Sequence, residues 1–429
     1  MRSGSAKIIS FGENGITASA AASRMSTTEG NALQVFGKSG DREKDLKLIG
    51  KVLASGHNTV IEHAYFNIAF NDVSVLTEQQ MIEHRLAAYT VKSRRYVNFS
   101  GAGYVVPEGL TEEETERFRA HMDGLFAAYN LLTELGVPCE DARFVLPYCF
   151  RSNFIMSVNA RELGHIINEM TTGRLSGYPE MVYLGNMLKE QADELFPGMV
   201  RPEKGCAEPA PCGKINPVPA EAAPDAEIVS AAAEPAKLLS RAAEFAGHGG
   251  LSLKEITRLP RPRELETLSY TFEVKDGSLA CVTHFTRHRI QSLLVPAPVT
   301  ALYGNRYVLP ATVGGIAEAV TLYKEVFAKN AAAAREFEGR PEILSYYALA
   351  GNTVDLLFTM NARELLHFLR LRTCSRAQWE IRYAARDMLA ELCGEFGELF
   401  RYYGPSCAVL GYCPEGRLSC GKPVKTEEN

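Results

Sequence analysis

The sequence predicts an α+β protein made of two tandem units of one kind, each with a small, mostly antiparallel sheet and long helices. The first observation is a repeated phrase, because Asn-Ala-Arg-Glu-Leu occurs at 159–163 and again at 361–365. The second is a His-Arg pair at 84–85 that recurs at 288–289. The copies are 202 and 204 residues apart, and a chance match would not keep this register. The pattern therefore indicates a diverged tandem duplication.

The third observation is the order of elements inside each copy. Alternating apolar residues predict strands at 63–70 and 267–274. A long helix is expected at 111–135, where Thr111 precedes acidic residues in the first turn. Strands and helices do not alternate as βαβ units, and the sequence has no G-x-G-x-x-G or P-loop motif. A Rossmann or Walker nucleotide site is therefore disfavoured.

The two copies are separated by a stretch rich in Pro, Ala and Glu that has no apolar period, which is typical of an exposed linker. The order of elements is expected to be similar on both sides of it. We expect unit one at 1–200, the linker at 201–224, unit two at 225–405, and a Cys/Gly-rich tail at 406–429.

Composition limits the class of partner. The chain has 429 residues, 46% hydrophobic and 23% charged, with a net charge of −5. No global basic field favours nucleic acid or a membrane surface, although local arginine clusters can still hold small anions. The sequence has no signal-length apolar core near its start and no apolar run of transmembrane length. A cytoplasmic protein is therefore expected.

The ten cysteines leave three interpretations open: reduced thiols, a metal or cluster site, or regulatory disulfides. None of the bunched cysteines forms the C-x₂-C knuckle of structural zinc sites, so no metal site is assigned. The cysteines whose role stays open are Cys206, Cys212, Cys407, Cys413 and Cys420.

Two basic clusters could bind anions. Arg287, His288 and Arg289 are adjacent, either as a solvated loop or as a contact for a phosphate or a flavin ring. Residues 93–96 combine a hydroxyl with two guanidinium groups, either as the start of a strand with exposed arginines or as a phosphate holder. Arg143 lies in a largely apolar segment, where a lone arginine needs an acidic or anionic partner.

The second copy of the repeated phrase, NARELLHFLRLR, predicts a helix with polar groups on two sides. Asn361 and Arg372 share a face with two apolar residues, whereas Arg363 and His367 lie four residues apart on another face. A helix buried against something polar fits this pattern, and a helix with surface charges is the alternative.

Together these segments resemble the flavin-dependent thymidylate synthases. The resemblance covers nearly the whole chain apart from the linker and tail, and several independent motifs occur in the family's order. These motifs are HNTVIEH at 57–63, S-x-R-Y at 93–96, AR-x-x-LP at 142–147, RHR-x-x-S at 287–292, the late helix N-x-R-x-x-x-[NH]-x-x-x-x-R at 361–372, and AQWEI at 377–381.

Unit one matches only part of the family pattern. Its S-x-R-Y segment at 93–96 and Arg143 match the part that holds the nucleotide phosphate. However, Glu83 stands where the first Arg of RHR is expected, and Met170 stands where the last Arg of the late helix is expected. The resemblance therefore implies that unit one retains the phosphate-holding side alone.

Unit two shows the converse losses. Its RHR motif at 287–289 and the late-helix Arg372 are intact. The S-x-R-Y element is displaced to GNRY at 304–307, and Ser345 stands in place of Arg143. The two sets of losses are complementary, so the resemblance implies that one complete site can be built from unlike halves.

The resemblance implies reductive methylation of dUMP to dTMP, with methylenetetrahydrofolate as the carbon donor and hydride passing from NADPH through FAD. Arg372 would be the catalytic residue that stabilises negative charge on the uracil ring. The residues implied to bind the nucleotide are Ser93, Arg94, Arg95, Arg143, Arg287 and Arg372. Those implied to contact FAD are Thr59, His84, Arg85, His288, Arg289, Asn361, Arg363 and His367.

Two alternatives remain, because the Asn-Glu pair of the family motif is replaced by Thr90-Val91 and by Leu294-Val295. The chain could be a non-catalytic homologue that binds flavin or nucleotide, or a flavoenzyme that methylates a different pyrimidine nucleotide. The family forms tetramers whose sites are shared between subunits. We therefore expect a homodimer that imitates a tetramer and holds two dUMP, because the other two places would offer Glu83 to the anion.

Overall fold

The computed structural model describes residues 4–201, 208 and 210–422. The expected linker thus lies partly outside the described residues, as does Cys206. The chain forms two compact units. The first combines residues 1–217 with 310–350, and the second combines residues 218–309 with 351–429. Residues 310–350 belong to the second copy by sequence and to the first unit by packing.

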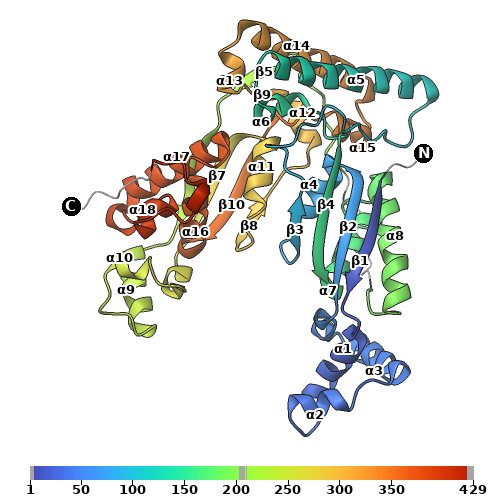
Figure 1. Cartoon of the computed structure of the whole chain (residues 1–429), viewed down its shortest axis with the longest axis vertical. Coiled ribbons are helices and arrows are strands. Elements are labelled where there is room, and N and C mark those ends of the chain that lie inside the picture. Colours follow the sequence, from blue (N-terminus) through green and yellow to red (C-terminus); the bar gives the residue numbers. More distant parts are fainter. Residues whose placement is uncertain (1–3, 202–207, 209, 423–429) are drawn as a thin grey trace. The chain divides into compact units, whose positions relative to one another are not determined.

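The first unit is built on a four-stranded antiparallel sheet (Figure 1). Alternation along the second strand buries Phe66, Ile68 and Phe70, as the sequence pattern predicts. The strand order is β1-β2-β4-β3. The strands are β1 (Ser5–Phe11), β2 (Tyr65–Ser74), β3 (Ala88–Val91) and β4 (Arg151–Asn159).

Helices from the same copy cover this sheet. The predicted helix at 111–135 is confirmed as α5, which a capping box between Thr111 and Glu114 opens. The last helix, α8, lies alongside β1 in Figure 1, where its Gln191 side chain bonds the Ile8 N–H and the Ala6 carbonyl, both at 2.9 Å. The helices are α1 (Gly15–Met25), α2 (Ala32–Gly37), α3 (Arg42–Ala54), η1 (Asn58–His63), α4 (Val75–Ile82), α5 (Glu112–Glu134), α6 (Cys139–Ala142), η2 (Arg143–Val145), α7 (Ala160–Thr171) and α8 (Pro179–Leu195).

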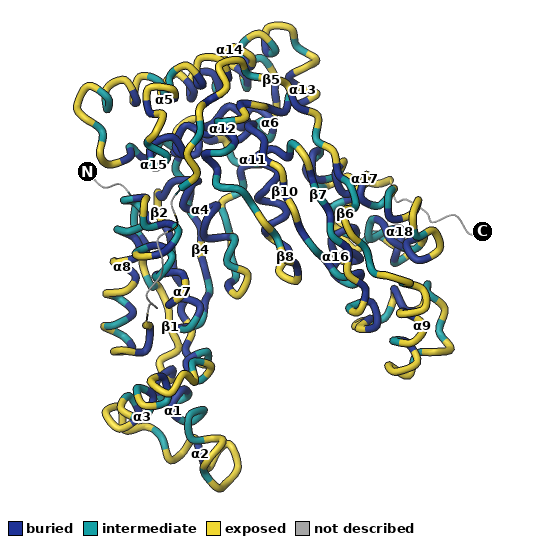
Figure 2. Tube along the Cα trace, turned by 180° about the vertical axis from the view of Figure 1, so that it is seen from behind, coloured by how far each residue is buried: buried dark blue, intermediate teal, exposed yellow. Residues whose placement is uncertain are grey.

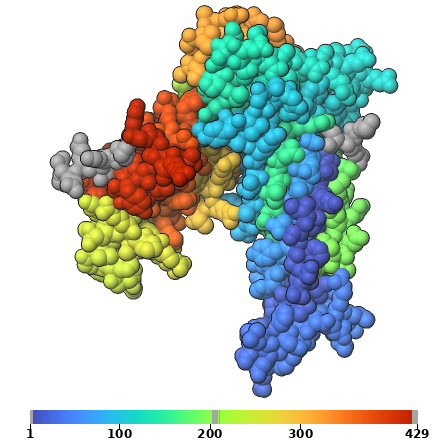
Figure 3. All heavy atoms as spheres, viewed as in Figure 1, coloured from blue at the N-terminus to red at the C-terminus, as the bar shows by residue number. Residues whose placement is uncertain are grey.

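Residues 310–350 complete the first unit. They form α13 (Ala311–Gly314), α14 (Ala317–Ala334), η4 (Arg335–Phe337), α15 (Pro341–Leu344) and η5 (Ser345–Tyr347). In the space-filling view the orange atoms of α14 lie against the teal atoms of α5 (Figure 3). His121 of α5 bonds Asn330 of α14 at 2.9 Å, and Tyr178 bonds Ser345 at 2.9 Å.

The second unit repeats the same sheet in the order β6-β7-β10-β8, again antiparallel. Its strands are β6 (Asp225–Ala231), β7 (Ser269–Ser278), β8 (Gln291–Leu294) and β10 (Thr353–Asn361), with a separate parallel pair β5 (Ala220–Ala222) and β9 (Arg306–Val308). Its helices are α9 (Pro235–Phe245), α10 (Leu253–Ile256), η3 (Arg263–Thr267), α11 (Leu279–Phe285), α12 (Val299–Gly304), α16 (Ala362–Arg372), α17 (Trp379–Phe396), η6 (Gly397–Leu399), α18 (Ser406–Leu410) and η7 (Gly416–Leu418).

The two sheets share the same irregularity at equivalent positions, as expected of duplicated units. Asp72 in β2 and Asp276 in β7 both adopt a positive φ, of 52° and 56°, which aspartate tolerates better than most residues. Their N–H groups donate to Asn153 and Asp355 on the neighbouring strand, at 3.0 and 2.8 Å. The predicted α+β fold with two tandem units is therefore confirmed.

A second matching pair fixes the start of α4 and α11. Ser74 donates its N–H and hydroxyl to the Glu180 carboxylate at 2.8 and 2.6 Å. Ser278 does the same to Glu380 at 2.7 and 2.5 Å. The dark-blue segments of Figure 2 include α4 and α11. A buried carboxylate needs such donors, so the Glu of AQWEI at 377–381 has a structural role in this chain.

Three further properties bear on function. Among the residues described, no helix is long and apolar enough to cross a bilayer. The same part of the chain holds no group of three His, Cys, Asp or Glu side chains arranged for a metal ion. No disulfide joins the cysteines that the structure describes, which include Cys212, Cys407, Cys413 and Cys420.

Candidate functional site

The repeated phrase begins a helix in the same way in both units. The Asn361 side chain caps α16 by accepting the Glu364 N–H at 2.9 Å. Asn159 caps α7 through the Glu162 N–H at 2.9 Å. Side-chain caps of this kind satisfy a backbone donor that a helix leaves without an internal partner. Asn361, predicted to contact FAD, therefore has a structural task in the folded chain.

The arginine of the phrase ties the helix to the segment that precedes the second strand of the sheet. Arg363 forms an ion pair with Glu266 of η3. Arg161 pairs with Glu62 of η1 at 2.6 Å. Each arginine is partly exposed, so one side of the guanidinium group can still face a ligand.

In the second unit, three side chains form a continuous polar chain. The His288 Nδ1 atom lies 3.0 Å from Glu364 Oε1. Arg372 Nε donates to His288 Nε2 at 3.1 Å, and Arg372 Nη2 donates to the His284 carbonyl at 3.2 Å. Because a guanidinium can only donate, Nε2 must be the acceptor and Nδ1 must carry the proton. Glu364 and His288 therefore hold the plane of Arg372.

The protonation of this chain follows from its burial. Burial lowers the pKa of His288 to about 2, and the positive charge of Arg372 acts in the same direction. Burial raises the pKa of the Glu364 carboxyl to about 6, against the opposing charges of His367 and Arg363. The imidazole is therefore neutral at physiological pH. It can orient Arg372 but cannot replace its charge.

Exposed basic side chains lie near the buried His288. Arg287 and Arg289 flank it in sequence and are both exposed. The His367 ring is exposed and lies 5.7 Å from the His288 ring between centroids. Among the residues predicted to contact FAD or the nucleotide in this unit, these three have the most open side chains.

The equivalent place in the first unit lacks both arginines. Met170 occupies the position of Arg372 and is fully buried. Glu83 accepts a hydrogen bond from Gln79 at 3.2 Å and lies 3.7 Å from Arg174. Burial raises the pKa of Glu83 to about 7, although the charge of Arg174 opposes the rise. The first unit therefore has a weakly acidic carboxyl, that of Glu83, where the second unit has an arginine.

The predicted FAD contacts of the first unit are His84, Arg85 and Thr59. His84 Nδ1 lies 3.5 Å from Glu162 Oε1, which repeats the His288–Glu364 contact at a longer distance. Arg85 and Thr59 are exposed, on the loop after α4 and on η1.

The residues predicted to clamp a phosphate meet around one acid. Arg95 Nε donates to Glu140 Oε1 at 2.7 Å, and its backbone N–H donates to Ser93 Oγ at 3.3 Å. Arg143 Nε donates to the Glu140 carbonyl at 2.9 Å, and the Arg143 side chain is almost fully buried. Arg95 and Arg143 are therefore brought together at Glu140, with Ser93 next to Arg95, and the Glu140 carboxylate already binds Arg95 as an anion would.

Arg94 is placed differently from its neighbours. Its guanidinium is buried and donates to Glu78 Oε1 at 2.5 Å. Ser152 donates to the same carboxylate, and the Phe150 ring lies 6.0 Å from the guanidinium carbon. A buried arginine with a buried acidic partner contributes to the fold, so Arg94 does not present an open face to a nucleotide.

Sequence reasoning missed the acids that organise these sites. The acids Glu140 and Glu364, and the basic Arg174, were not assigned any role from the sequence. Glu364 belongs to the repeated phrase, and its position three residues after a capping Asn was a usable signal. Glu140 is 45 residues from Arg95 along the chain, and no local pattern links the two.

These features define a class: an α+β protein of duplicated units, with a guanidinium cluster in each and different residues retained in the two copies. The family model of the thymidylate synthase complementing protein, Thy1, matches residues 7–198 and 224–396. The chain belongs to this family of flavin-dependent thymidylate synthases, which confirms the family resemblance.

Curated relatives match part of the chain. A flavin-dependent thymidylate synthase of Geobacter sulfurreducens is 40% identical over 121 residues, which are 27% of this chain and 52% of the relative. One from Clostridium tetani is 53% identical over 73 residues, 17% of this chain and 29% of the relative. One from Thermococcus onnurineus is 32% identical over 132 residues, which are 29% of this chain and 54% of the relative. The chain spans about half or less of these relatives' lengths.

Solved structures are similar at low identity. A UMP/dUMP methylase, PolB, from Streptomyces cacaoi bound with 5-Br dUMP is 20% identical, with a TM-score of 0.40, covering 46% of this chain and 93% of that one. Thymidylate synthase X from Helicobacter pylori, with FAD and dUMP, is 21% identical, with a TM-score of 0.36. The match covers 46% of this chain and 99% of that one.

Proposed function

We propose that this chain is an FAD-dependent thymidylate synthase that methylates dUMP reductively to dTMP. Methylenetetrahydrofolate would supply the carbon and NADPH the hydride. The observation that carries the proposal is the Glu364–His288–Arg372 chain of the second unit, because it orients a half-buried guanidinium. A fixed donor of this kind stabilises charge that develops during reaction without having to reorganise.

The first unit would supply the phosphate clamp. Arg95 binds the Glu140 carboxylate, Arg143 binds the Glu140 backbone carbonyl, and Ser93 accepts the Arg95 N–H; a nucleotide phosphate would take the place of the Glu140 carboxylate against Arg95. Charge-assisted, two-pronged contacts suit arginine and phosphate. Each nucleotide site would then use one clamp and one Arg372 helix, which explains why neither unit needs both.

The donor set fits a flavin dinucleotide in part. Arg85, Arg289, His367 and Thr59 are exposed and could donate to diphosphate oxygens or ring carbonyls. His288 and Asn361 are engaged inside the unit, so their contribution to FAD would be to position these neighbours and Arg372. FAD, when bound, would carry the hydride from NADPH to the one-carbon unit.

A second candidate is methylation of a different pyrimidine nucleotide by the same machinery. It is favoured by one observation, the replacement of the family's Asn-Glu pair by Thr90-Val91 and Leu294-Val295. Neither replacement pair has a carboxylate or an amide, so contacts made through the Asn-Glu pair elsewhere must differ here.

The test is turnover by the purified full chain after loading with FAD. dUMP, methylenetetrahydrofolate and NADPH should give dTMP, measured by chromatography of the nucleotides. Methylation of another pyrimidine nucleotide but not dUMP would favour the second candidate. FAD binding with no product from any pyrimidine nucleotide would refute the enzymatic proposal and leave a binding protein.

The expected assembly is part of this proposal. A homodimer would contain two clamps and two Arg372 helices, and so would bind two dUMP. Light scattering should report twice the 47.2 kDa chain mass, and calorimetric titration should give one dUMP per chain. An active monomer would refute the assembly, and two equivalent dUMP per chain would refute the division of tasks between the copies.

A further inference from the structure

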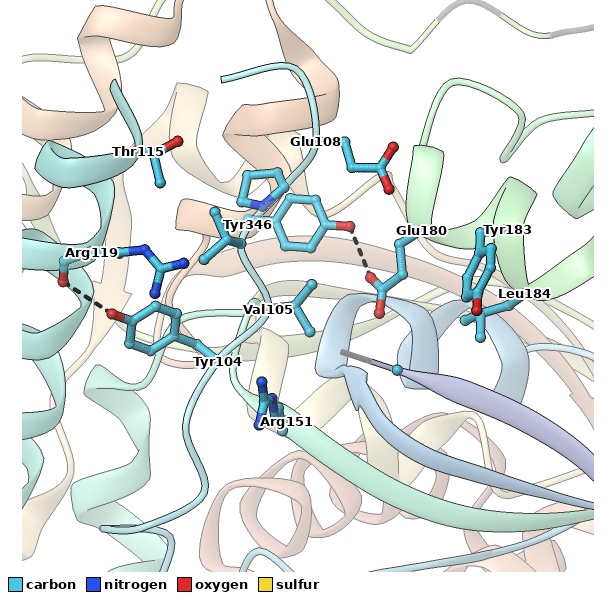
Figure 4. A pocket seen from close by; sticks show the side chains of 13 residues that line it. Tyr104, Val105, Glu108, Thr115, Arg119, Arg151, Glu180, Tyr183, Leu184 and Tyr346 are labelled. Atoms are coloured by element: carbon cyan, nitrogen blue, oxygen red, sulfur yellow. Dashed lines mark hydrogen bonds between the residues drawn. The ribbon is translucent and has the colours of Figure 1, made fainter. Parts of the chain in front are cut away.

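The first unit contains a pocket that the proposed reaction does not use. Its volume is about 340 Å³, within the range of pockets that hold small organic ligands. It is lined by the segment before α5, by α5 itself, by the start of β4, by the start of α8 and by Tyr346 of η5 (Figure 4). None of the predicted nucleotide or flavin residues lines it.

Two guanidinium groups give this pocket its charge. Figure 4 shows Arg119 of α5 and Arg151 of β4 pointing into it. Within the part of the chain that the structure describes, neither forms an ion pair, and the Arg151 Nε atom is buried without a hydrogen-bond partner. A buried guanidinium nitrogen without an acceptor is costly, so an anion at this place would satisfy it.

The acids near these arginines are engaged by other donors. Glu180 accepts from the Ser74 N–H and hydroxyl and also from the Tyr346 hydroxyl at 2.8 Å. Asp123 accepts from the Tyr104 hydroxyl at 2.8 Å. These carboxylates keep their negative charge, and a further acid, Glu108, lines the pocket as an exposed side chain. None of the three carboxylates forms an ion pair with Arg119 or Arg151 among the described residues, so both guanidinium groups are available to an anion.

Aromatic and apolar side chains form much of the remaining wall. The rings of Tyr104 and Tyr346 border the pocket, together with Val105, Pro107 and Leu184. Aromatic rings favour stacking with another flat ring, and both phenol groups are already committed as donors. The walls therefore suit a planar apolar body more than a hydrated inorganic ion.

We propose that this pocket binds a small flat organic anion, with its carboxylate or phosphate between Arg119 and Arg151 and its ring between Tyr104 and Tyr346. The guanidinium fork matches either anionic group, so the shared chemistry is an aromatic acid. The proposal is independent of thymidylate synthesis, because it needs neither FAD nor the phosphate clamp.

Isothermal titration of the full chain without FAD tests it, with 4-hydroxybenzoate, phenyl phosphate, neutral 4-hydroxybenzamide and inorganic phosphate as probes. At least one aromatic acid should bind saturably, once per chain. The amide should bind at least about tenfold more weakly, because it lacks the charge that the arginines neutralise. Inorganic phosphate should also bind more weakly than phenyl phosphate. An amide that binds as tightly as the acids overturns the proposal.

Variants locate the binding. Arg119→Gln and Arg151→Gln should each weaken the aromatic acid at least about tenfold, with an unchanged melting temperature for the exposed Arg119→Gln. Arg335→Gln removes an exposed charge from the same unit outside the pocket and should leave affinity unchanged. Loss of binding in Arg95→Gln instead would assign the ligand to the phosphate clamp and overturn the pocket. Unchanged affinity in both pocket variants would do the same.

Discussion

The helices α7 and α16 begin identically and end differently. In both, an asparagine caps the first turn, an arginine pairs with an acid of the 3-10 helix before the second strand of the sheet, and a glutamate approaches a histidine. At the far end, α16 presents Arg372 to His288, whereas α7 buries Met170. The shared part maintains the fold, and the differing part is where the copies can diverge in chemistry.

Arg372→Met removes the difference between the two helices most directly, because it gives α16 the residue that α7 has at this position. Turnover should fall about 10²- to 10³-fold, the scale for removing one preorganised donor at a developing charge. Steady-state dTMP formation measures it. Met170→Leu in α7 is the matched control and should leave turnover near the starting value. Normal activity in Arg372→Met would remove the catalytic assignment.

The next largest effect is expected in the copy that keeps the clamp. Arg95→Gln should weaken dUMP by about 1.5–3 kcal/mol, the range for a hydrogen bond to a charged group. Deoxyuridine, which has no phosphate, should be affected much less. Calorimetric titration of both ligands decides the matter, and equal losses would argue against a phosphate clamp at Ser93, Arg95 and Arg143.

The raised pKa of Glu83 predicts that the stability of the folded chain depends on pH, an effect that the first copy alone should contribute at this position. The Glu83 pKa is about 7 in the folded chain against about 4.5 unfolded, so the folded state binds more protons between these values. Stability should therefore fall as pH rises from about 4.5 to 7. Glu83→Gln should remove that fall and gain about 1–2 kcal/mol at pH 8, with no gain at pH 4.5. Calorimetric melting across pH, with Arg287→Gln as the comparison, is the measurement. A gain that is the same at both pH values would contradict the raised pKa.

The smallest effect should be equal in the two copies. Asn159→Ala and Asn361→Ala each remove an N-cap and should lower the free energy of unfolding by about 1 kcal/mol. Asn361→Asp keeps a capping oxygen and should restore most of it. Urea unfolding gives the stability, and FAD titration gives the second readout. A loss of FAD affinity in Asn361→Ala without such a loss in Asn361→Asp would assign the effect to the cap and to helix position.

Local patterns were sufficient to predict much of the fold. Alternation at 63–70 and 267–274 predicted the cores of β2 and β7, and Thr111 predicted the start of α5. The strands continue to Ser74 and Ser278, past an irregularity in the strand pairing near Asp72 and Asp276. Such an irregularity depends on the neighbouring strand, so periodicity alone does not reveal it.

The candidate site was predictable by residue type and less so by partner. Repetition directed attention to His288, Arg363 and Arg372, and the structure places His288 and Arg372 in contact. The sequence did not indicate that the Arg94 side chain is buried against Glu78 while the Arg95 side chain binds Glu140. Adjacent residues on an irregular segment can point in opposite directions, and only the tertiary fold decides which one is buried.

The packing of residues 310–350 into the first unit has a consequence for synthesis on the ribosome. Asn330 and Ser345 complete contacts with His121 and Tyr178 that are 209 and 167 residues earlier in the chain. The N-terminal half therefore cannot reach its final packing as it emerges, and must wait until the second copy has been translated as far as residue 350. Contacts this distant in sequence slow folding and leave apolar surface exposed in the interval. A gene cut at the linker would release a nascent chain that lacks the segment it needs to finish folding.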